Sequence, residues 1–187
     1  MLFRRRLNEL ERVLFCDSDF KTIRIESNII SIDFGFAECP HATSIAVSED
    51  NKYYDSRGNC NAIIETATNT LIRGCENTII PNSVRIIAFH AFAGVFGLKT
   101  VIIPNGVRII DSWAFSNCWS LETVEIPKSV HTICESAFIS NRLISVTIKN
   151  KKAKIDKYAF DCHAIINGQP RDYWLSVEGD CLDLQKN

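Results

Sequence analysis

Eight cysteines and four histidines carry the most reactive side chains of this sequence. The cysteines stand at positions 16, 39, 60, 75, 118, 134, 162 and 181, and the histidines at positions 41, 90, 131 and 163. Zinc sites usually contain closely spaced pairs such as Cys-x-x-Cys, and this sequence has none. The histidines are dispersed along the chain. The spacing therefore predicts neither a metal site nor a catalytic centre.

The sequence also lacks the short motifs that position catalytic or phosphate-binding groups. It has no Gly-x-Ser-x-Gly, no His-Glu-x-x-His, no phosphate-binding glycine loop and no dinucleotide fingerprint. Its formal net charge of -1 gives no global field that would attract nucleic acid. No apolar run approaches the roughly 20 residues of a membrane-spanning helix. We therefore expect a non-enzymatic protein without a cofactor, a nucleic-acid partner or a membrane span.

The apolar residues follow a repeat, and this repeat must position any functional side chain. Three Ile-Pro pairs begin at Ile80, Ile103 and Ile126, which stand 23 residues apart. Further apolar residues recur at matching places after each pair: Val84, Val107 and Val130; Ile87, Ile110 and Ile133; Phe92, Phe115 and Phe138; Leu98, Leu121 and Leu143. Such repetition is typical of stacked arrays in which each repeat buries its apolar side chains against the next. The sequence predicts a repeat solenoid, mainly β, that forms a single domain over residues 1–187.

Regularity divides this domain into five expected parts. They are an N-terminal helical cap (1–18), degenerate repeats (20–47), a β-hairpin insertion (48–79), regular repeats (80–163) and a C-terminal cap (164–187). Caps are expected because a terminal repeat otherwise exposes its core face. The spacing of Leu7, Leu10 and Leu14 predicts an amphipathic helix over residues 2–15, and the alternation of Tyr173, Leu175 and Val177 predicts a strand.

The Leu-x-x-Val-x-Ile part of each repeat has the period of a strand, so we expect one short parallel strand per repeat. Its outward positions form two columns. One is rich in hydroxyl groups: Thr22, Ser44, Thr100, Thr123 and Ser145. The other mixes charged, apolar and polar types: Arg24, Ala46, Ile102, Glu125 and Thr147. The mixed column is either a recognition surface or an unconstrained solvated face.

The insertion contains two strand-like runs, residues 61–66 and 69–74, around a turn at Ala67-Thr68. A two-residue turn there would place Cys60 opposite Cys75. These cysteines then form either a cross-strand disulfide in an oxidising compartment or two buried thiols. Tyr53, Tyr54 and Arg57 precede the hairpin and include residue types enriched in interface hot spots, so they are candidate protein-binding residues.

Two other slots of the repeat hold residues that could react or bind a ligand. Cys118 occupies a place that holds Val95 and Asn141 in the neighbouring repeats and Cys39 further upstream, which indicates a tight interior corner and buried thiols at Cys39 and Cys118. A second slot holds Arg85, Arg108 and His131. These stacked cations either hold an acidic ligand or are solvated charges near acidic partners such as Asp111 or Glu135.

The pattern Ile-Pro-x-x-Val-x-x-Ile-x-x-x-Ala-Phe-x-x-x-x-x-Leu-x-x-Val-x-Ile-Pro resembles the BspA-like (Treponema-type) leucine-rich repeat family over about residues 20–163. Residues 53–66 and 71–75 resemble hairpin segments between the repeats of bacterial members. The resemblance implies a right-handed leucine-rich-repeat superhelix without catalytic residues. It also implies cell-surface or secreted proteins of anaerobic bacteria and some protists that bind host matrix proteins or other cells.

Two functional hypotheses follow. The first is a protein-binding module that uses the mixed column (Arg24, Ile102, Glu125 and Thr147) or the residues before the hairpin. The second is a structural or self-associating element of a larger surface assembly, which pairs through array ends or strand edges. Residues 1–10 carry charge where a signal peptide needs an apolar stretch, so no export signal is expected and the localisation stays open.

Overall fold

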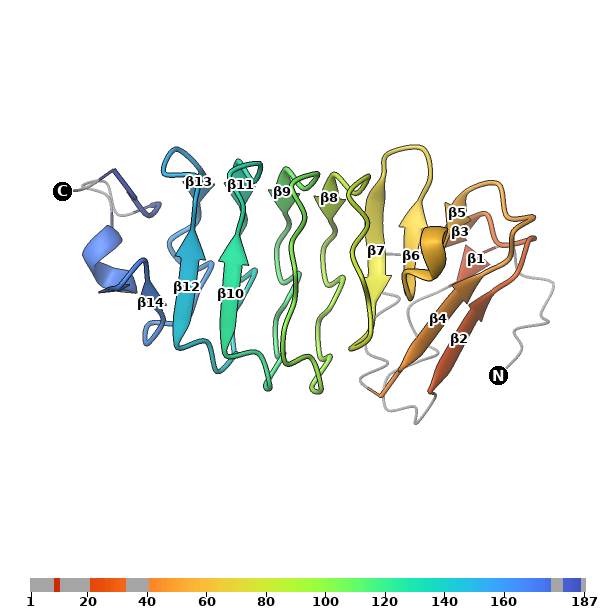
Figure 1. Cartoon of the computed structure of the whole chain (residues 1–187), viewed down its shortest axis with the longest axis horizontal. Coiled ribbons are helices and arrows are strands. Elements are labelled where there is room, and N and C mark those ends of the chain that lie inside the picture. Colours follow the sequence, from red (N-terminus) through yellow and green to blue (C-terminus); the bar gives the residue numbers. More distant parts are fainter. Residues whose placement is uncertain (1–8, 11–20, 33–40, 176–179, 186–187) are drawn as a thin grey trace.

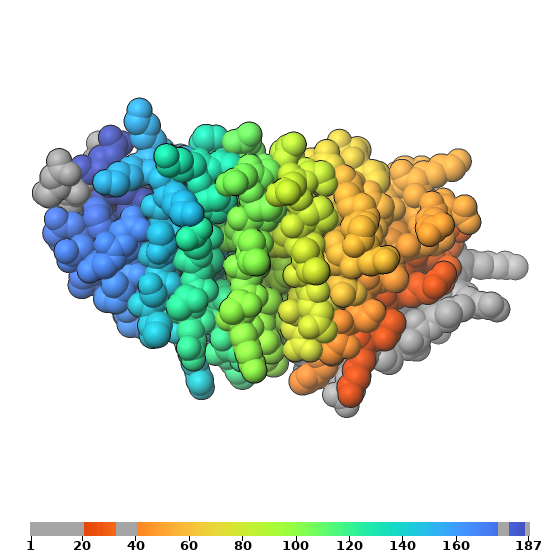
Figure 2. Space-filling view, viewed as in Figure 1, coloured from red at the N-terminus to blue at the C-terminus, as the bar shows by residue number. Residues whose placement is uncertain are grey.

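The structure is a computed structural model that describes residues 9–10, 21–32, 41–175 and 180–185. The chain winds into a β-solenoid, with the strands of successive coils side by side along the long axis (Figure 1). The coils form successive bands along that axis (Figure 2). The predicted mainly β repeat solenoid is confirmed.

The first row of strands comes from the Leu-x-x-Val-x-Ile segments. It contains β2 (Thr22–Ile25) paired with β4 (Ser44–Val47), and further along β10 (Thr123–Ile126), β12 (Ser145–Ile148) and β14 (Ile165–Ile166), all parallel. β15 (Gln169–Pro170) closes this row by pairing antiparallel with β14. Buried and exposed residues alternate along β2, β10 and β12, because every second side chain faces the core.

A second row of two-residue strands, which the sequence did not predict, follows the Val-x-x-Ile segments. Four of its members pair in parallel: β8 (Ile86–Ile87), β9 (Ile109–Ile110), β11 (Thr132–Ile133) and β13 (Lys154–Ile155). Near the N-terminus, β1 (Glu9–Leu10) pairs with β3 (Ser31–Ile32) in the same way. Backbone hydrogen bonds therefore join neighbouring coils in both rows, and also at the Ala-Phe corners, where the amides of Phe92 and Phe115 donate to Ala114 and Ala137 at 2.7 Å.

The predicted hairpin is confirmed, and it continues the second row instead of protruding from it. β6 (Ala62–Glu65) pairs antiparallel with β7 (Thr70–Gly74), β7 pairs parallel with β8, and β5 (Tyr54–Asp55) pairs with β6. The result is a seven-stranded sheet from β13 to β5. β7 is buried throughout its length, so the hairpin is part of the scaffold.

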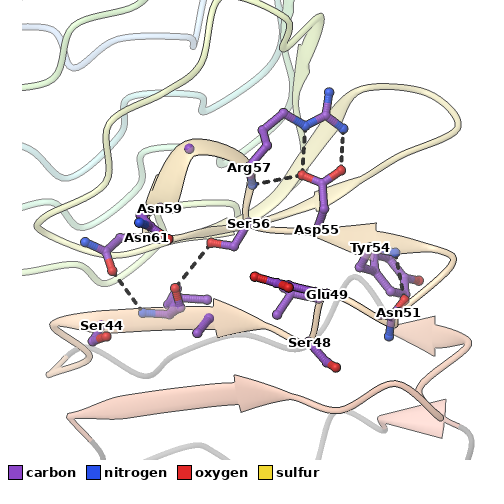
Figure 3. A pocket seen from close by; sticks show the side chains of 14 residues that line it. Ser44, Ser48, Glu49, Asn51, Tyr54, Asp55, Ser56, Arg57, Asn59 and Asn61 are labelled. Carbon is purple, nitrogen blue, oxygen red and sulfur yellow. Dashed lines mark hydrogen bonds and ion pairs between the residues drawn. The ribbon is translucent and has the colours of Figure 1, made fainter.

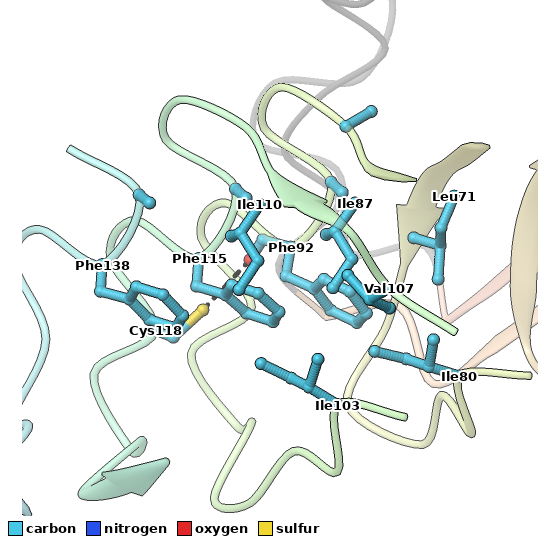
Figure 4. Packing of buried hydrophobic residues seen from close by; sticks show 14 of the residues in the cluster. Leu71, Ile80, Ile87, Phe92, Ile103, Val107, Ile110, Phe115, Cys118 and Phe138 are labelled. Atoms are coloured by element: carbon cyan, nitrogen blue, oxygen red, sulfur yellow. Dashed lines mark hydrogen bonds between the residues drawn. The ribbon is translucent and has the colours of Figure 1, made fainter. Parts of the chain in front are cut away.

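A phenylalanine stack runs through the core of the regular coils (Figure 4). Phe92, Phe115, Phe138 and Phe160 are fully buried, with successive ring centroids 4.8, 5.0 and 5.1 Å apart and rings within 8° of parallel. The stack ends against Gly74 of β7, where any Cβ would collide with the ring of Phe92. The missing side chain lets the hairpin pack against the first regular coil.

Two secondary-structure predictions are wrong. Glu9 and Leu10 form a strand where a helix over residues 2–15 was expected, because pairing with β3 satisfies their backbone; the rest of that segment lies outside the described residues. Near the C-terminus, Arg171–Trp174 form the 3-10 helix η3 instead of a strand. The indole of Trp174 is buried there and donates to the carbonyl of Ile166 at 2.9 Å. Val177 lies outside the described residues.

Candidate functional site

The structure aligns the mixed column as the sequence predicts. The parallel register places Arg24 beside Ala46, Ile102 beside Glu125, and Glu125 beside Thr147. All five side chains are exposed. Glu125 forms an ion pair with Lys149, and Arg24 pairs with Glu26 at 3.2 Å. The ends of the column are therefore polar and solvated, and its centre is the isoleucine at position 102.

Ile79 belongs to the same column and was missed in the sequence. Ile79-Ile80-Pro81 precedes the first regular coil as Ile102-Ile103-Pro104 precedes the second, so the repeat itself carries the signal. Ile79 is 76% exposed and Ile102 is 85% exposed. Both line a hollow of about 310 Å³, together with Glu76, Asn77, Thr78, Ile80 and Thr100. The structure thus brings two exposed isoleucines to one depression between neighbouring coils.

The three candidates before the hairpin have different environments. Tyr53 is about half exposed, but Tyr54 is buried, and its hydroxyl accepts a hydrogen bond from the Ile32 amide at 3.0 Å. Burial raises the pKa of Tyr54. The side chain of Tyr54 thus joins the insertion to β3, and its role in binding stays a prediction.

Arg57 is held by the scaffold on several sides. Its Nη2 and Nε donate to the carboxylate of Asp55 at 2.6 and 2.7 Å. The remaining nitrogen, Nη1, donates to Asn69 at 2.7 Å and to Ser83 at 3.3 Å. The hydrogen-bonded carboxylate of Asp55 raises the pKa of Arg57. Arg57 begins the 3-10 helix η2 (Arg57–Asn59), so its contacts fix this turn at the start of the hairpin.

A second hollow of about 480 Å³ lies along β4 (Figure 3). One wall is the whole of β4 with Ser48 and Glu49. The opposite wall consists of residues 54–59, which include Asp55 and Arg57, and of Asn61. Figure 3 shows Ser56 and Asn61 reaching toward β4, while Asp55 and Arg57 pair with each other on the side of their segment away from β4. The arrangement of charges and donors suits a polar ligand or an extended peptide, and it contains no nucleophile with an adjacent base.

Cys60 and Cys75 are both free thiols, so the cross-strand disulfide is not formed. A bulge between Ile63 and Ile64 shifts the hairpin register, pairing Ala62 with Gly74 and removing the alignment that the two-residue turn implied. Burial raises the pKa of both thiols. Of the two alternatives left open by the sequence, the structure has the buried thiols.

Cys118 lies in an interior corner, as predicted. It is fully buried, its thiol donates to the carbonyl of Phe92 at 3.2 Å, and burial raises its pKa to about 12. Asn141, in the same slot of the next coil, accepts from the Cys118 amide at 2.7 Å. Cys39 lies outside the described residues. This slot therefore holds the turn together and offers no reactive thiol.

The column of cations binds main-chain carbonyls, in place of the acidic partners that were expected. The guanidinium of Arg85 donates to the carbonyls of Asn82 and Gly106 at 3.0 and 3.2 Å, and that of Arg108 donates to Ser129 at 3.4 Å. His131 lies 3.3 Å from the side-chain nitrogen of Asn150. These contacts tie successive turns together.

Within residues 9–10, 21–32, 41–175 and 180–185, no three histidine, cysteine, aspartate or glutamate side chains are grouped so that they could hold a metal ion. In the same residues, no helix has the length and apolar character needed to cross a membrane.

Most of the chain matches one family model. The model of the BspA type leucine rich repeat region matches residues 1–72 and 70–169 in six copies. No curated protein is similar enough to be counted as a relative.

Solved structures of bacterial proteins share the fold. A leucine-rich repeat protein from Eubacterium ventriosum is 19% identical with a TM-score of 0.56, and the alignment covers 72% of this chain and 48% of that one. A leucine rich cell surface protein from Faecalibacterium prausnitzii is 21% identical with a TM-score of 0.55, covering 80% and 47%. The pneumococcal vaccine antigen PcpA is 14% identical with a TM-score of 0.50, covering 78% and 50%. This chain thus spans about half the length of each.

Proposed function

The chain belongs to the BspA-type leucine-rich repeat family, and from this premise we propose that it is a non-enzymatic module that binds another protein through the first row of strands. The single observation that carries the proposal is the pair Ile79 and Ile102, which are 76% and 85% exposed beside one hollow. Large apolar side chains at the centre of a polar face are the arrangement found in protein interfaces.

The flanking residues fit the rim of such an interface. Arg24 and Glu125 carry charges at either side, and Thr147 continues the row beyond Glu125. Exposed rim charges contribute little affinity but select the partner and its orientation. Tyr53, which is about half exposed in the turn between β4 and β5, is a further candidate contact.

The partner we propose is a protein met at a cell surface, such as a host matrix protein. Two observations support this choice: the family assignment, and the shared fold with a structure described as a leucine rich cell surface protein. Because this chain spans about half of that protein, the proposal concerns the repeat array and leaves the whole protein's activity aside.

The test measures binding of the full chain to a panel of immobilised matrix proteins, with a double variant Ile79→Ser and Ile102→Ser. Loss of two central apolar contacts should weaken binding more than about tenfold. Ile144→Ser is the matched control, because this isoleucine is also exposed (61%) but does not line the hollow. Absence of wild-type binding across the panel, or equal binding by the double variant, would contradict the proposal.

The same isoleucine pair supports a second candidate, self-association. Light scattering after size exclusion distinguishes the two functions. A dimer that the double variant abolishes would assign the apolar pair to a second copy of the chain, and a monomer that still binds a matrix protein would assign it to a foreign partner.

A further inference from the structure

β4 has one paired edge and one edge that faces the hollow. On the paired side, the amides of Ser44 and Ser48 donate to Lys21 and Ile25 of the β2 coil at 3.1 and 2.8 Å. Backbone groups alternate in direction along a strand, so the N–H and C=O of Ile45 and Val47 point to the other side. In the described part of the chain, the sheet that contains β4 has β2 as its second and last strand.

Side chains, not another strand, meet the backbone of Ile45. Its amide donates to Asn61 at 3.4 Å, and its carbonyl accepts from Ser56 at 3.3 Å (Figure 3). Both distances exceed the usual ranges of about 2.7–3.2 Å for N–H···O and about 2.5–3.0 Å for O–H···O bonds. These side chains therefore cap the edge weakly and can be displaced at small cost.

The hollow beside this edge runs along the whole of β4, and a further strand would enter it once Ser56 and Asn61 turn away from Ile45. Its volume is about 480 Å³, and all four residues of β4 line it. Because backbone groups alternate in direction along the strand, the N–H and C=O of Val47 point into this space. The side chain of Val47 is half buried against the core, so an incoming apolar side chain would rest on it.

The charges of the lining indicate the partner's chemistry. Asp55 and Arg57 neutralise each other in the ion pair at 2.6 Å. Glu49 then supplies the charge of the hollow, at the end where β4 stops, and it is exposed. A lysine or arginine on the incoming strand would be favoured opposite Glu49.

We propose that β4 binds an extended segment of a partner protein by strand addition, with β-branched side chains against Val47 and a basic residue near Glu49. In this mode main-chain hydrogen bonds supply affinity and alternate side chains supply specificity. The site goes beyond the proposed function, because it is separate from Ile79 and Ile102 and uses backbone groups where that surface uses side chains.

The test uses the full isotope-labelled chain and a synthetic peptide of about eight residues that alternates valine or threonine with lysine. Binding should protect the amide of Val47 from hydrogen exchange and shift its NMR signal, while the amides of Ser44 and Ser48 keep their existing protection. A control peptide of the same sequence, N-methylated on the residues whose amides face β4, should bind about tenfold more weakly or worse.

Two variants sharpen the test. Ser56→Ala combined with Asn61→Gly removes both caps, and glycine suits position 61, where φ is 53°. The peptide should then bind about threefold more tightly or better, because it no longer competes with the caps. Glu49→Gln should weaken binding about two- to fivefold and reduce its salt dependence.

Three results would overturn the proposal. They are absence of peptide binding up to about 1 mM, equal binding of the N-methylated peptide, and binding that leaves the Val47 amide unprotected. If the chain forms a dimer and the peptide dissociates it, the edge of β4 binds a second copy of the chain instead of a foreign partner. The double variant Ile79→Ser and Ile102→Ser should leave peptide binding unchanged, which separates this site from the proposed function.

Discussion

The regular coils after Ile80 and the interrupted stretch between β4 and Ile80 satisfy their backbone in different ways. In the regular coils, one coil bonds directly to the next: the Phe115 amide donates to Ala137 at 2.7 Å, for example. In the interrupted stretch, side chains supply part of this bonding, beside the backbone pairing of β5, β6 and β7. The side-chain amide of Asn51 donates to the carbonyls of Glu26 and Ile29 in the preceding coil at 2.8 and 3.0 Å. The side chains of Asn61 and Ser56 bond to the backbone of Ile45.

This difference distinguishes the regular coils, whose contacts hold the fold together, from the edge of β4, whose side-chain contacts can be replaced by a ligand. A backbone bond between coils is lost only when the coils separate, which also exposes the apolar core between them. A side-chain cap can rotate away while the fold remains intact. We therefore expect substitutions in the regular coils to change stability, and those along β4 and the exposed isoleucines to change binding.

Leu121→Asp is the most severe way to break the regular half. Leu121 is fully buried, so the variant places a carboxylate without a partner between two coils. The cooperative unfolding transition, followed by circular dichroism on heating, should be lost. The matched control, Ile102→Asp, changes an isoleucine that is 85% exposed and should keep the transition. An unchanged transition in Leu121→Asp would contradict the solenoid core.

Phe115→Ala tests the stack directly. Phe115 contacts Phe92 on one side and Phe138 on the other, so truncation leaves a cavity that should lower the free energy of unfolding by about 3–5 kcal/mol in denaturant titrations. In the interrupted stretch, Tyr54→Phe leaves the Ile32 amide without its partner and should cost about 1–3 kcal/mol. Equal losses would remove the energetic contrast between the two regions.

Gly74→Ala tests the junction between them. A Cβ at this position collides with the ring of Phe92, and we expect a loss of about 1–3 kcal/mol because the hairpin or the stack must shift. Gly97→Ala is the matched control, since its Cβ would meet only the exposed carboxylate end of Glu76. Thermal unfolding of both variants decides whether the hairpin is packed as tightly as the coils. A smaller loss of stability for Gly74→Ala than for Gly97→Ala would show that the hairpin is packed less tightly than the coils.

Cys118→Val gives the smallest effect, and it depends on pH. The pKa of the folded thiol is about 12, against an ordinary value of 9.0, so the unfolded state ionises first as pH rises. The contribution to stability is complete below about pH 9 and is lost toward pH 12, by at most about 1.4 kcal/mol per pH unit. Valine, which fills this slot at position 95, does not ionise. The variant should therefore lose this part of the decrease in the free energy of unfolding between pH 8 and 10, measured by denaturant titration at each pH. An identical slope in both proteins would refute it.

The periodic part of the fold could be predicted from the sequence because each apolar slot has one geometric role. Cys118 shows this well, since its slot alone indicated a buried corner. The family resemblance is confirmed by the family model. The second row of strands was not predicted, because pairs such as Ile86–Ile87 are too short to show a strand period.

The candidate site was predicted only in part, because long-range contacts decide exposure. The mixed column was placed correctly, since repeat position fixes which way a side chain points. The burial of Tyr54 was not predicted, because its partner, the Ile32 amide, lies 22 residues away. The disulfide alignment failed because a bulge has no clear signature in two short apolar runs. The open edge of β4 could not be predicted, because it depends on whether another described strand pairs with β4, and the local sequence does not determine that.

The hydrogen bonds between coils run along the long axis of the molecule, and this direction has a mechanical consequence. Tension applied between the two ends loads these bonds in line and opens them one coil after another, as a zipper opens, instead of shearing many at once. Each coil of 22 or 23 residues, the offset between paired strands, then releases about 70–80 Å of chain. Single-molecule stretching should record a series of low force peaks at this spacing. A single high peak would show that the hairpin and the phenylalanine stack bind all coils into one mechanical unit. A chain that yields stepwise would act as an extensible tether between whatever is held at its two ends.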